Sequence, residues 1–100
     1  MFETVGNAAD IAVGEMRAFQ IGGAKVTVAH AAGALFAFDD TCTHMGCSLA
    51  MGSLDGTTVT CRCHGSQFDV TTGAVLRGPA ARPVRSRAIE VHGRDLSIEV

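Results

Sequence analysis

The residues best suited to chemistry lie in two short clusters, Cys42-Thr43-His44-Met45-Gly46-Cys47 and Cys61-Arg62-Cys63-His64-Gly65-Ser66. Each cluster pairs thiols with an imidazole, and residues 45–60 separate the two thiol-imidazole pairs. A sulfide-bridged pair of irons needs four protein ligands, and two loops that each give one thiolate and one imidazole can approach it from opposite sides. One [2Fe-2S] cluster is therefore a chemistry that these residues can support, with four candidate cofactor-binding and metal-ligating residues: Cys42, His44, Cys61 and His64.

At these positions the chain resembles the Rieske family, which writes C-x-H followed by C-x-x-H. It is most similar to the subtype with the motifs C-T-H-x-G-C and C-x-C-H-G-S, found in subunits of cytochrome bc complexes and in small bacterial ferredoxins. The resemblance implies a disulfide between the two cluster loops, at Cys47 and Cys63. It also reaches Arg77-Gly78-Pro79-Ala80, which is similar to a third loop that covers the cluster in the family.

Further residues are expected around the cluster. A hydroxyl that hydrogen-bonds a cluster sulfur favours the reduced state, so Ser66 should raise the reduction potential. High-potential respiratory members of the family carry a tyrosine where this chain has Phe68, so we expect an intermediate potential, inside the range of about −150 to +300 mV. The resemblance places the exposed imidazole edges at the tip of the molecule, with a rim formed by Met45, Gly46, Gly65 and Pro79.

Other metal sites and catalytic arrangements fit these residues less well. Two cysteines and two histidines could hold a structural zinc, although zinc sites usually repeat C-x-x-C or H-x-x-x-H spacings. A plant-type cluster fails because its next expected cysteine position is Ala50. Cys63 and His64 are sequence neighbours that seldom face each other, so a nucleophilic pair is disfavoured. Cys47 and Cys63 could also remain reduced in a cytoplasmic protein.

The segments around these clusters indicate many short strands, because glycines punctuate stretches of alternating or β-branched residues. We expect an all-β fold, and the resemblance specifies a small antiparallel Rieske-type domain of stacked sheets with the cluster-binding part at one tip. It would be one domain over residues 1–100, with the cluster loops within 41–80. The expected strands are 2–5, 16–21, 25–30, 35–38, 57–60, 67–70, 75–76, 84–91 and 96–100. Strands 16–21, 25–30 and 35–38 should form a meander, and strands 84–91 and 96–100 should form a closing hairpin.

Composition restricts the classes of partner. The chain has 100 residues and a formal net charge of −2, and its arginines gather only at Arg77, Arg82, Arg85 and Arg87, which we interpret as a solvated strand face. No wide basic face with stacking aromatics is present, so no nucleic acid is expected. No apolar run is long enough to span a bilayer and no signal-peptide pattern begins the chain, which predicts no membrane contact and a cytoplasmic location.

Function follows from what the sequence offers and lacks. Without a substrate pocket, nucleotide loop or general base, the chain should be an electron carrier and no enzyme in its own right. The resemblance implies a monomeric ferredoxin that takes electrons from a flavin-dependent reductase and delivers them to a terminal, ring-hydroxylating oxygenase. The alternatives are a small subunit of a nitrite reductase or respiratory oxidase, and a zinc-stabilised binding module. Asp39-Asp40 is interpreted as a strand end, and His30 and His92 as solvent-facing residues without a role.

Overall fold

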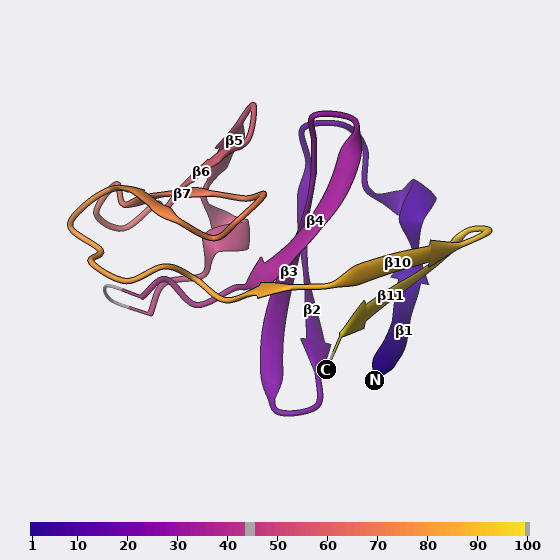
Figure 1. The fold of residues 1–100 in the computed structure, drawn as a ribbon. Helices are drawn as coiled ribbons and strands as arrows, with labels where there is room; N and C mark the ends of the chain where they lie inside the picture. The colour runs from indigo at the N-terminus through magenta and orange to yellow at the C-terminus, as the bar shows by residue number, and fades with distance from the viewer. Residues whose placement is uncertain (44–45, 100) are drawn as a thin grey trace.

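A computed structural model describes residues 1–43 and 46–99. The described chain is all-β and antiparallel, with two single-turn 3-10 helices, and its strands form three small sheets (Figure 1). The strands are β1 (Phe2–Asn7), β2 (Met16–Ile21), β3 (Ala24–Ala31), β4 (Ala34–Asp39), β5 (Ser53–Asp55), β6 (Thr58–Thr60), β7 (Gln67–Asp69), β8 (Val75–Arg77), β9 (Ser86–Arg87), β10 (Ile89–His92) and β11 (Asp95–Glu99). The 3-10 helices are η1 (Ala8–Asp10) and η2 (Leu49–Met51).

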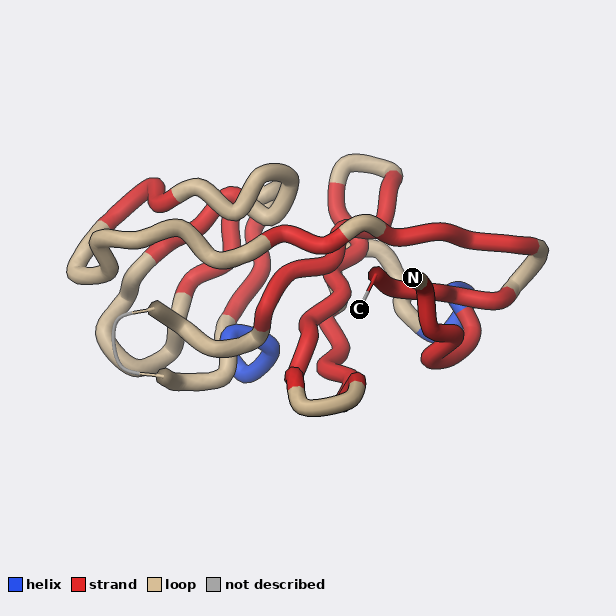
Figure 2. The backbone as a smooth tube through the Cα atoms, turned by 60° about the horizontal axis from the view of Figure 1, so that its bottom comes forward, coloured by secondary structure: helices blue, strands red, loops and turns tan. Residues whose placement is uncertain are grey.

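The sheets divide the molecule into a base and a tip. The orders β1-β11-β10 and β2-β3-β4-β9 form the base, and β5-β6-β7-β8 lies in the tip. Figure 2 shows that the long loops gather at the tip, whereas the base is mostly strand. The expected all-β fold of stacked antiparallel sheets is confirmed, including the β2-β3-β4 meander and the closing β10-β11 hairpin.

The segment 84–91 corrects the expectation of one continuous strand. Its first part, β9, pairs with β4, whereas its second part, β10, pairs with β11 in the other sheet of the base. Ala88 stands between the two strands, and its carbonyl accepts a hydrogen bond of 2.9 Å from the Glu99 backbone N–H. Residues 84–91 alternate regularly in sequence across the point where the chain passes from one sheet to the other, so the sequence pattern alone does not indicate this change of sheet. Strand β5 was also absent from the expected set.

The described chain has two hydrophobic cores, one within the base and one, called the tip core, formed where the tip packs against β3 and β4. The base core packs β3 against the β10-β11 hairpin through Val26, Val28, Leu96 and Ile98, all fully buried. The tip core contains Phe38, Leu49, Val59, Phe68 and the two cysteines Cys42 and Cys61. Each large apolar side chain that is fully buried in one of these cores stabilises the fold by roughly 1.5–3 kcal/mol. The cysteines predicted to bind metal are therefore part of a packed core.

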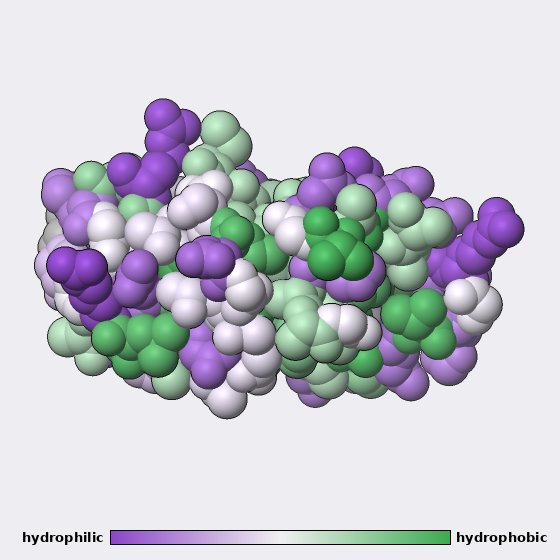
Figure 3. All heavy atoms as spheres, turned by 90° about the horizontal axis from the view of Figure 1, so that it is seen from above, coloured by the Kyte–Doolittle hydropathy of each residue, from purple (hydrophilic) through white to green (hydrophobic). Residues whose placement is uncertain are grey.

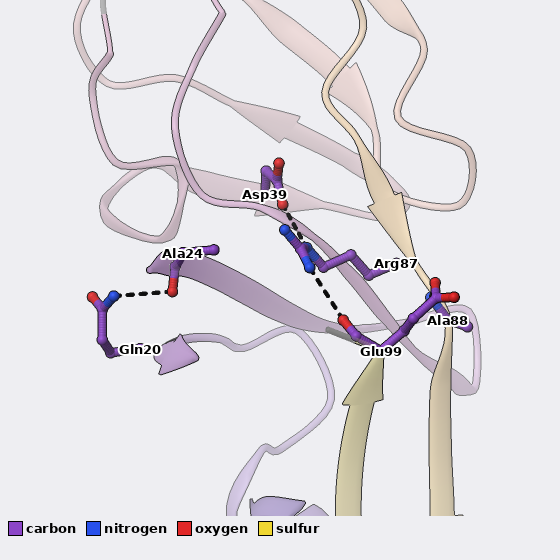
Figure 4. Close-up of polar contacts among 6 residues, drawn as sticks. All are labelled: Gln20, Ala24, Asp39, Arg87, Ala88 and Glu99. Atoms are coloured by element: carbon purple, nitrogen blue, oxygen red, sulfur yellow. Dashed lines mark hydrogen bonds and ion pairs between the residues drawn. The ribbon is translucent and has the colours of Figure 1, made fainter. Parts of the chain in front are cut away.

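Arg87 connects the two sheets of the base and corrects the interpretation of the arginines as a solvated face. Its Nε lies 2.6 Å from Asp39 Oδ1 and its Nη1 donates to the Glu99 carbonyl at 3.2 Å, as Figure 4 shows. Its side chain is only 8% exposed. The long aliphatic part of an arginine side chain can be buried when its guanidinium group is paired. The alternating pattern of residues 84–91 could not reveal that Asp39 is the partner of Arg87. Arg77, Arg82 and Arg85 are exposed, as expected.

His30 also differs from its expected role as a solvent-facing residue. It is half-buried at the end of β3, and its Nδ1 lies 2.9 Å from the Ile11 carbonyl. Its own backbone N–H and carbonyl bond Glu15 and Gly14. His30 therefore fixes the loop between η1 and β2 to the base sheet. His92 is exposed beside Glu90, at 3.5 Å.

Gly73 illustrates how closely the tip is packed, and it provides a prediction. Its φ is +85°, a Cβ there would collide with the Val84 carbonyl, and the Val84 backbone N–H donates to the Gly73 carbonyl at 2.9 Å. We expect Gly73→Ala to lower the free energy of unfolding by more than about 1 kcal/mol. Gly56→Ala is the control, because Gly56 has a φ of +59° with open space around it. If urea denaturation shows the same loss of stability in both variants, the close approach of Gly73 to the Val84 carbonyl does not account for the effect of Gly73→Ala.

No described helix has the length or the apolar character required to cross a bilayer.

Candidate metal centre

Two loops at the tip carry the predicted ligands, and their backbones repeat one hydrogen-bond pattern. In the first loop, the Cys42 N–H donates to the Cys47 carbonyl at 2.8 Å and the Gly46 N–H to the Cys42 carbonyl at 2.9 Å. In the second, the Cys61 N–H donates to the Ser66 carbonyl at 2.8 Å and the Gly65 N–H to the Cys61 carbonyl at 3.1 Å. The loops are thus equivalent turns, each opening on a cysteine.

Glycine is required at the same place in both turns. Gly46 has a φ of +77° and Gly65 a φ of +79°, a left-handed conformation that side-chain-bearing residues rarely adopt. The motifs C-x-x-x-G-C and C-x-x-x-G-S therefore encode the same backbone turn, which places Cys42 and Cys61 at matching positions. The shared turn explains why the two sequence clusters have a glycine at the same position.

The cysteines divide into two free thiols and one disulfide. Cys42 and Cys61 are free and only 2% and 3% exposed. Cys47 and Cys63 form a disulfide with a Cα–Cα distance of 6.5 Å, which joins the two loops. The predicted pairing is confirmed, and the alternative of two reduced thiols at Cys47 and Cys63 is wrong. The disulfide leaves one thiol in each loop to serve as a ligand.

The same disulfide argues against a zinc site built from cysteines. The sulfurs of Cys47, Cys61 and Cys63 lie within 4.8 Å of one another, which is close enough to suggest a metal-binding triad. Two of the three are joined to each other, so only Cys61 keeps a thiolate to offer. Two buried thiols in matched turns instead fit the thiolate half of a Rieske donor set.

The remaining predicted residues lie around these turns. His64 is exposed and directly follows the disulfide cysteine Cys63. Gly46 and Pro79 are exposed, and Gly65 is half-buried. His44 and Met45 lie outside the described residues, so their predicted roles as ligand and rim residue stay predictions.

Ser66 holds the third loop against the second. It is fully buried, and its Oγ accepts a hydrogen bond of 3.0 Å from the Ala80 backbone N–H, one residue after Pro79. Because the hydroxyl oxygen accepts this bond, its own proton can still be donated, as the expected bond to a sulfur requires. Thr43 makes a comparable link, since its Oγ1 donates to the Arg82 carbonyl at 2.7 Å. All three loops are therefore tied together by side chains of the two motifs.

Asp40 anchors the first loop to the base and was interpreted from the sequence only as part of a strand end. It is 2% exposed, and its Oδ1 accepts hydrogen bonds from the Thr27 hydroxyl and, at 2.9 Å, from the Ala50 backbone N–H. Its Oδ2 lies 3.6 Å from Lys25 Nζ. An acidic residue two positions before Cys42, the first predicted ligand, was the available signal in the sequence, but the hydrogen-bond partners of Asp40 are distant in sequence.

The electrostatics of Asp40 follow from these contacts. Burial by itself would raise the pKa of this carboxyl, but the hydrogen bonds, led by that from Thr27, and the charge of Lys25 outweigh burial. They hold the pKa of Asp40 below its ordinary value of 3.8. The carboxylate is therefore ionised at neutral pH and accepts the hydrogen bonds that join β3 to η2.

Comparison with known proteins agrees with this geometry. The profile of the Rieske [2Fe-2S] domain matches residues 2–88, and the chain belongs to this family. The chain is 33% identical to the ferredoxin component of biphenyl 2,3-dioxygenase of Rhodococcus jostii (strain RHA1), covering 94% of this chain and 88% of that protein. It is also 33% identical to the cytochrome b6-f complex iron-sulfur subunit of Chlorobaculum thiosulfatiphilum, covering 95% of this chain but only 51% of that protein.

Comparison with a solved structure leads to the same class of protein as comparison with the ferredoxin relative. A chain in the complex of reduced oxygenase and oxidized ferredoxin of carbazole 1,9a-dioxygenase superposes with a TM-score of 0.91 and 32% identity, over 97% of this chain and 91% of that one. The predictions of a Rieske-type [2Fe-2S] cofactor and of a ferredoxin-type carrier, as opposed to a catalytic oxygenase, are confirmed by these relatives. The family is an iron-sulfur family, which sets aside the zinc-stabilised module.

Phe68 gives a prediction about the electronic environment of the site. It is fully buried at the centre of β7, in the same core as Cys42 and Cys61. We expect Phe68→Tyr to raise the reduction potential, because a phenol hydroxyl that donates to a ligand sulfur stabilises the more negative reduced state. Phe36→Tyr is the control, since Phe36 packs against the same core from β4. Voltammetry that finds no shift, or the same shift in both variants, would contradict a ring facing the ligand sulfurs.

Proposed function

We propose that this chain is a ferredoxin that carries one electron at a time on a Rieske [2Fe-2S] cluster held by Cys42, His44, Cys61 and His64. The observation that carries the proposal is the pair of matched turns, each presenting one buried free thiol beside a disulfide that joins them. Neutral imidazole donates less charge than thiolate, so the cluster accepts an electron more easily than one bound only by cysteines.

The chain's own residues would support this chemistry in distinct ways. Burial of Cys42 and Cys61 keeps water from the ligand sulfurs, and the disulfide fixes the spacing of their loops. Ser66 offers a hydroxyl proton while it holds the third loop in place. His64, Gly46 and Pro79 are exposed at the tip, where a small transient interface would give partner proteins access. Met45 and Gly65 would complete the rim.

We propose the following partners and setting. The donor is a flavin-dependent reductase. The acceptor is a terminal, ring-hydroxylating oxygenase, by analogy with the biphenyl dioxygenase relative. Residues 1–100 work as one Rieske domain with the cluster loops within 41–80. The carrier is a monomer in the cytoplasm that binds neither nucleic acid nor membrane.

A second candidate function is supported by one observation. The iron-sulfur subunit of the cytochrome b6-f complex is as similar to this chain as the biphenyl dioxygenase ferredoxin is, and the chain matches about half of that subunit. The alternative is therefore a permanent subunit of a larger redox enzyme, of the nitrite reductase or respiratory oxidase type. A monomer in solution that a flavin reductase and NADH reduce within seconds supports the free carrier. Stable co-purification with a larger enzyme supports the subunit.

The electron paramagnetic resonance spectrum of the dithionite-reduced protein tests the cluster itself, with iron and zinc quantified on the same sample. The proposal expects a rhombic signal, an average g below that of four-cysteine clusters, and about two irons per chain. A sample that is silent and contains zinc but no iron would overturn it.

A further inference from the structure

The charges of this chain are distributed unevenly between its tip and its base. The tip, taken as residues 41–86, contains four arginines and only two acidic residues, which gives it a net charge of +2. The other 54 positions contain four basic and eight acidic residues, a net charge of −4. An oxidised cluster with two sulfides and two thiolates adds no net charge, and one electron does not reverse the positive sign. The end that carries the ligands is therefore positive in a negative protein.

The basic side chains border a groove beside the first ligand turn. The groove encloses about 390 Å³, and its walls include Lys25, Arg82, Arg85, Thr41 and Thr43. Thr41 and Thr43 flank the ligand cysteine Cys42 on both sides. The groove is therefore continuous with the surface at which the proposed electron transfer takes place.

The arginines of this groove lack acidic partners within the described chain. Asp39 also lines the groove, but its carboxylate points to Arg87 and bonds it at 2.6 Å, as seen in Figure 4. Lys25 lies 3.6 Å from the buried Asp40. Among residues 1–43 and 46–99, neither Arg82 nor Arg85 forms an ion pair. Arg62 and Arg77, also exposed at the tip, are likewise outside those pairs. Four guanidinium groups thus remain available to carboxylates of another molecule.

Apolar contact offers a weaker basis for docking. On the face shown in Figure 3, the hydrophobic residues form separate small groups between polar ones. The exposed large apolar side chains of the described chain are also spread over both ends, with Met51 and Leu76 in the tip and Met1, Phe2, Val13 and Val91 in the base. The charge is the more concentrated feature of the tip.

We propose that the positive tip, with the Arg82-Arg85 groove as its main contact, binds an acidic face of the protein that accepts the electron. The inference rests on the proposed carrier function and names the chemistry of its partner. The negative base would face away from such a partner, so the charge separation also turns the tip toward it before contact.

Small redox ions test the sign of the field at the tip without the partner. Ferricyanide takes one electron from the reduced protein and becomes ferrocyanide, so its second-order rate constant reports the local potential. We expect this constant to fall about tenfold between about 10 mM and about 0.3 M salt, because screening weakens attraction of an anion to the tip. A cationic cobalt(III) phenanthroline complex should show the opposite dependence. A ferricyanide rate that rises with salt, as the net charge of −2 alone predicts, would overturn the proposal.

Charge-reversal variants locate the effect. Arg82→Glu/Arg85→Glu should remove or invert the salt dependence for ferricyanide. Arg17→Glu/Arg94→Glu changes the net charge equally at exposed positions outside the tip, and should keep the dependence of the unmodified protein. Arg82→Gln/Arg85→Gln provides a milder pair if the reversed variant does not fold. The same change in both the groove and control variants would contradict a role for the groove.

Binding of a hexaglutamate peptide gives a readout that does not involve electron transfer. Titrated into the holoprotein at low salt, it should shift the backbone amide resonances of Lys25, Arg82 and Arg85 in nuclear magnetic resonance spectra, whereas hexalysine should not. Absence of these shifts would reject the groove as a carboxylate site. An iron-free, silent sample would instead reject the carrier function, so the two failures are distinguishable.

Discussion

Replacing Cys42 or Cys61 by alanine should abolish the iron-sulfur cluster, with loss of visible absorption and iron content near zero. Each change removes the only free thiol of its loop, because the other cysteine of that loop is in the disulfide. A ligand set that lacks one thiolate cannot complete the coordination of its iron. Since cluster binding contributes to folding free energy, both variants should also unfold at lower temperature. Absorption, iron content and thermal unfolding are measured on the same samples.

The double variant Cys47→Ala/Cys63→Ala is the matched control. It removes two cysteines from the same loops but leaves both proposed ligand thiols. We expect it to acquire the cluster while losing about 3 kcal/mol of stability, because a disulfide that closes a loop of 16 residues restricts the unfolded chain by that amount. A double variant without iron, beside a Cys61→Ala variant with iron, would contradict the proposed ligand assignment.

Replacing Asp40 by alanine should lower the free energy of unfolding by about 2–4 kcal/mol at neutral pH. The change leaves the buried Thr27 hydroxyl and the Ala50 N–H without their acceptor. Asp40→Asn keeps an oxygen at Oδ1 and should lose only about 1 kcal/mol. The two variants are compared with the unmodified protein by urea denaturation. Equal losses in both would indicate that the carboxylate charge, and no hydrogen bond, accounts for the effect.

The contribution of Asp40 should depend on pH in a defined direction. Its pKa in the folded protein is below the ordinary value of 3.8, so its stabilisation is complete above that value. It is lost as pH falls through the lowered pKa, because the folded state must then take up a proton it binds weakly. The difference in stability between the unmodified protein and Asp40→Asn should therefore be constant near neutral pH and diminish in acid.

Asp69 is the comparison for this acid dependence. The Thr71 hydroxyl and backbone N–H donate to its carboxylate and lower its pKa as well, but these bonds are exposed to solvent. Asp69→Asn should have a smaller effect than Asp40→Asn, since water replaces exposed hydrogen bonds at little cost. An acid dependence that disappears in Asp69→Asn and persists in Asp40→Asn would contradict the role given to Asp40.

Much of the site could be read from local sequence because its parts are local. The turn that presents Cys42 is closed by bonds to Gly46 and Cys47, and that of Cys61 by bonds to Gly65 and Ser66, all within six residues. The pairing of Cys47 with Cys63 came from the family resemblance, since spacing does not fix the connectivity of cysteines. The roles of Asp40 and of the Ser66 bond to Ala80 were out of reach, because their partners depend on how distant segments pack.

The amino-acid sequence alone was enough to predict the two candidate ligand motifs, the all-β character, the β2-β3-β4 meander and the closing β10-β11 hairpin. Each depends on residue spacing, alternation or a short turn, and these act between near neighbours along the chain. Three features could be seen only in the folded chain: the pairing of β1 with β11, the division of the strand expected over 84–91 at Ala88, and the groove beside Cys42 that Arg82 and Arg85 border. These features arise where segments that are far apart in sequence meet. The packing between the two segments selects the strand pairing and the shape of the groove there, and no local sequence pattern contains that information.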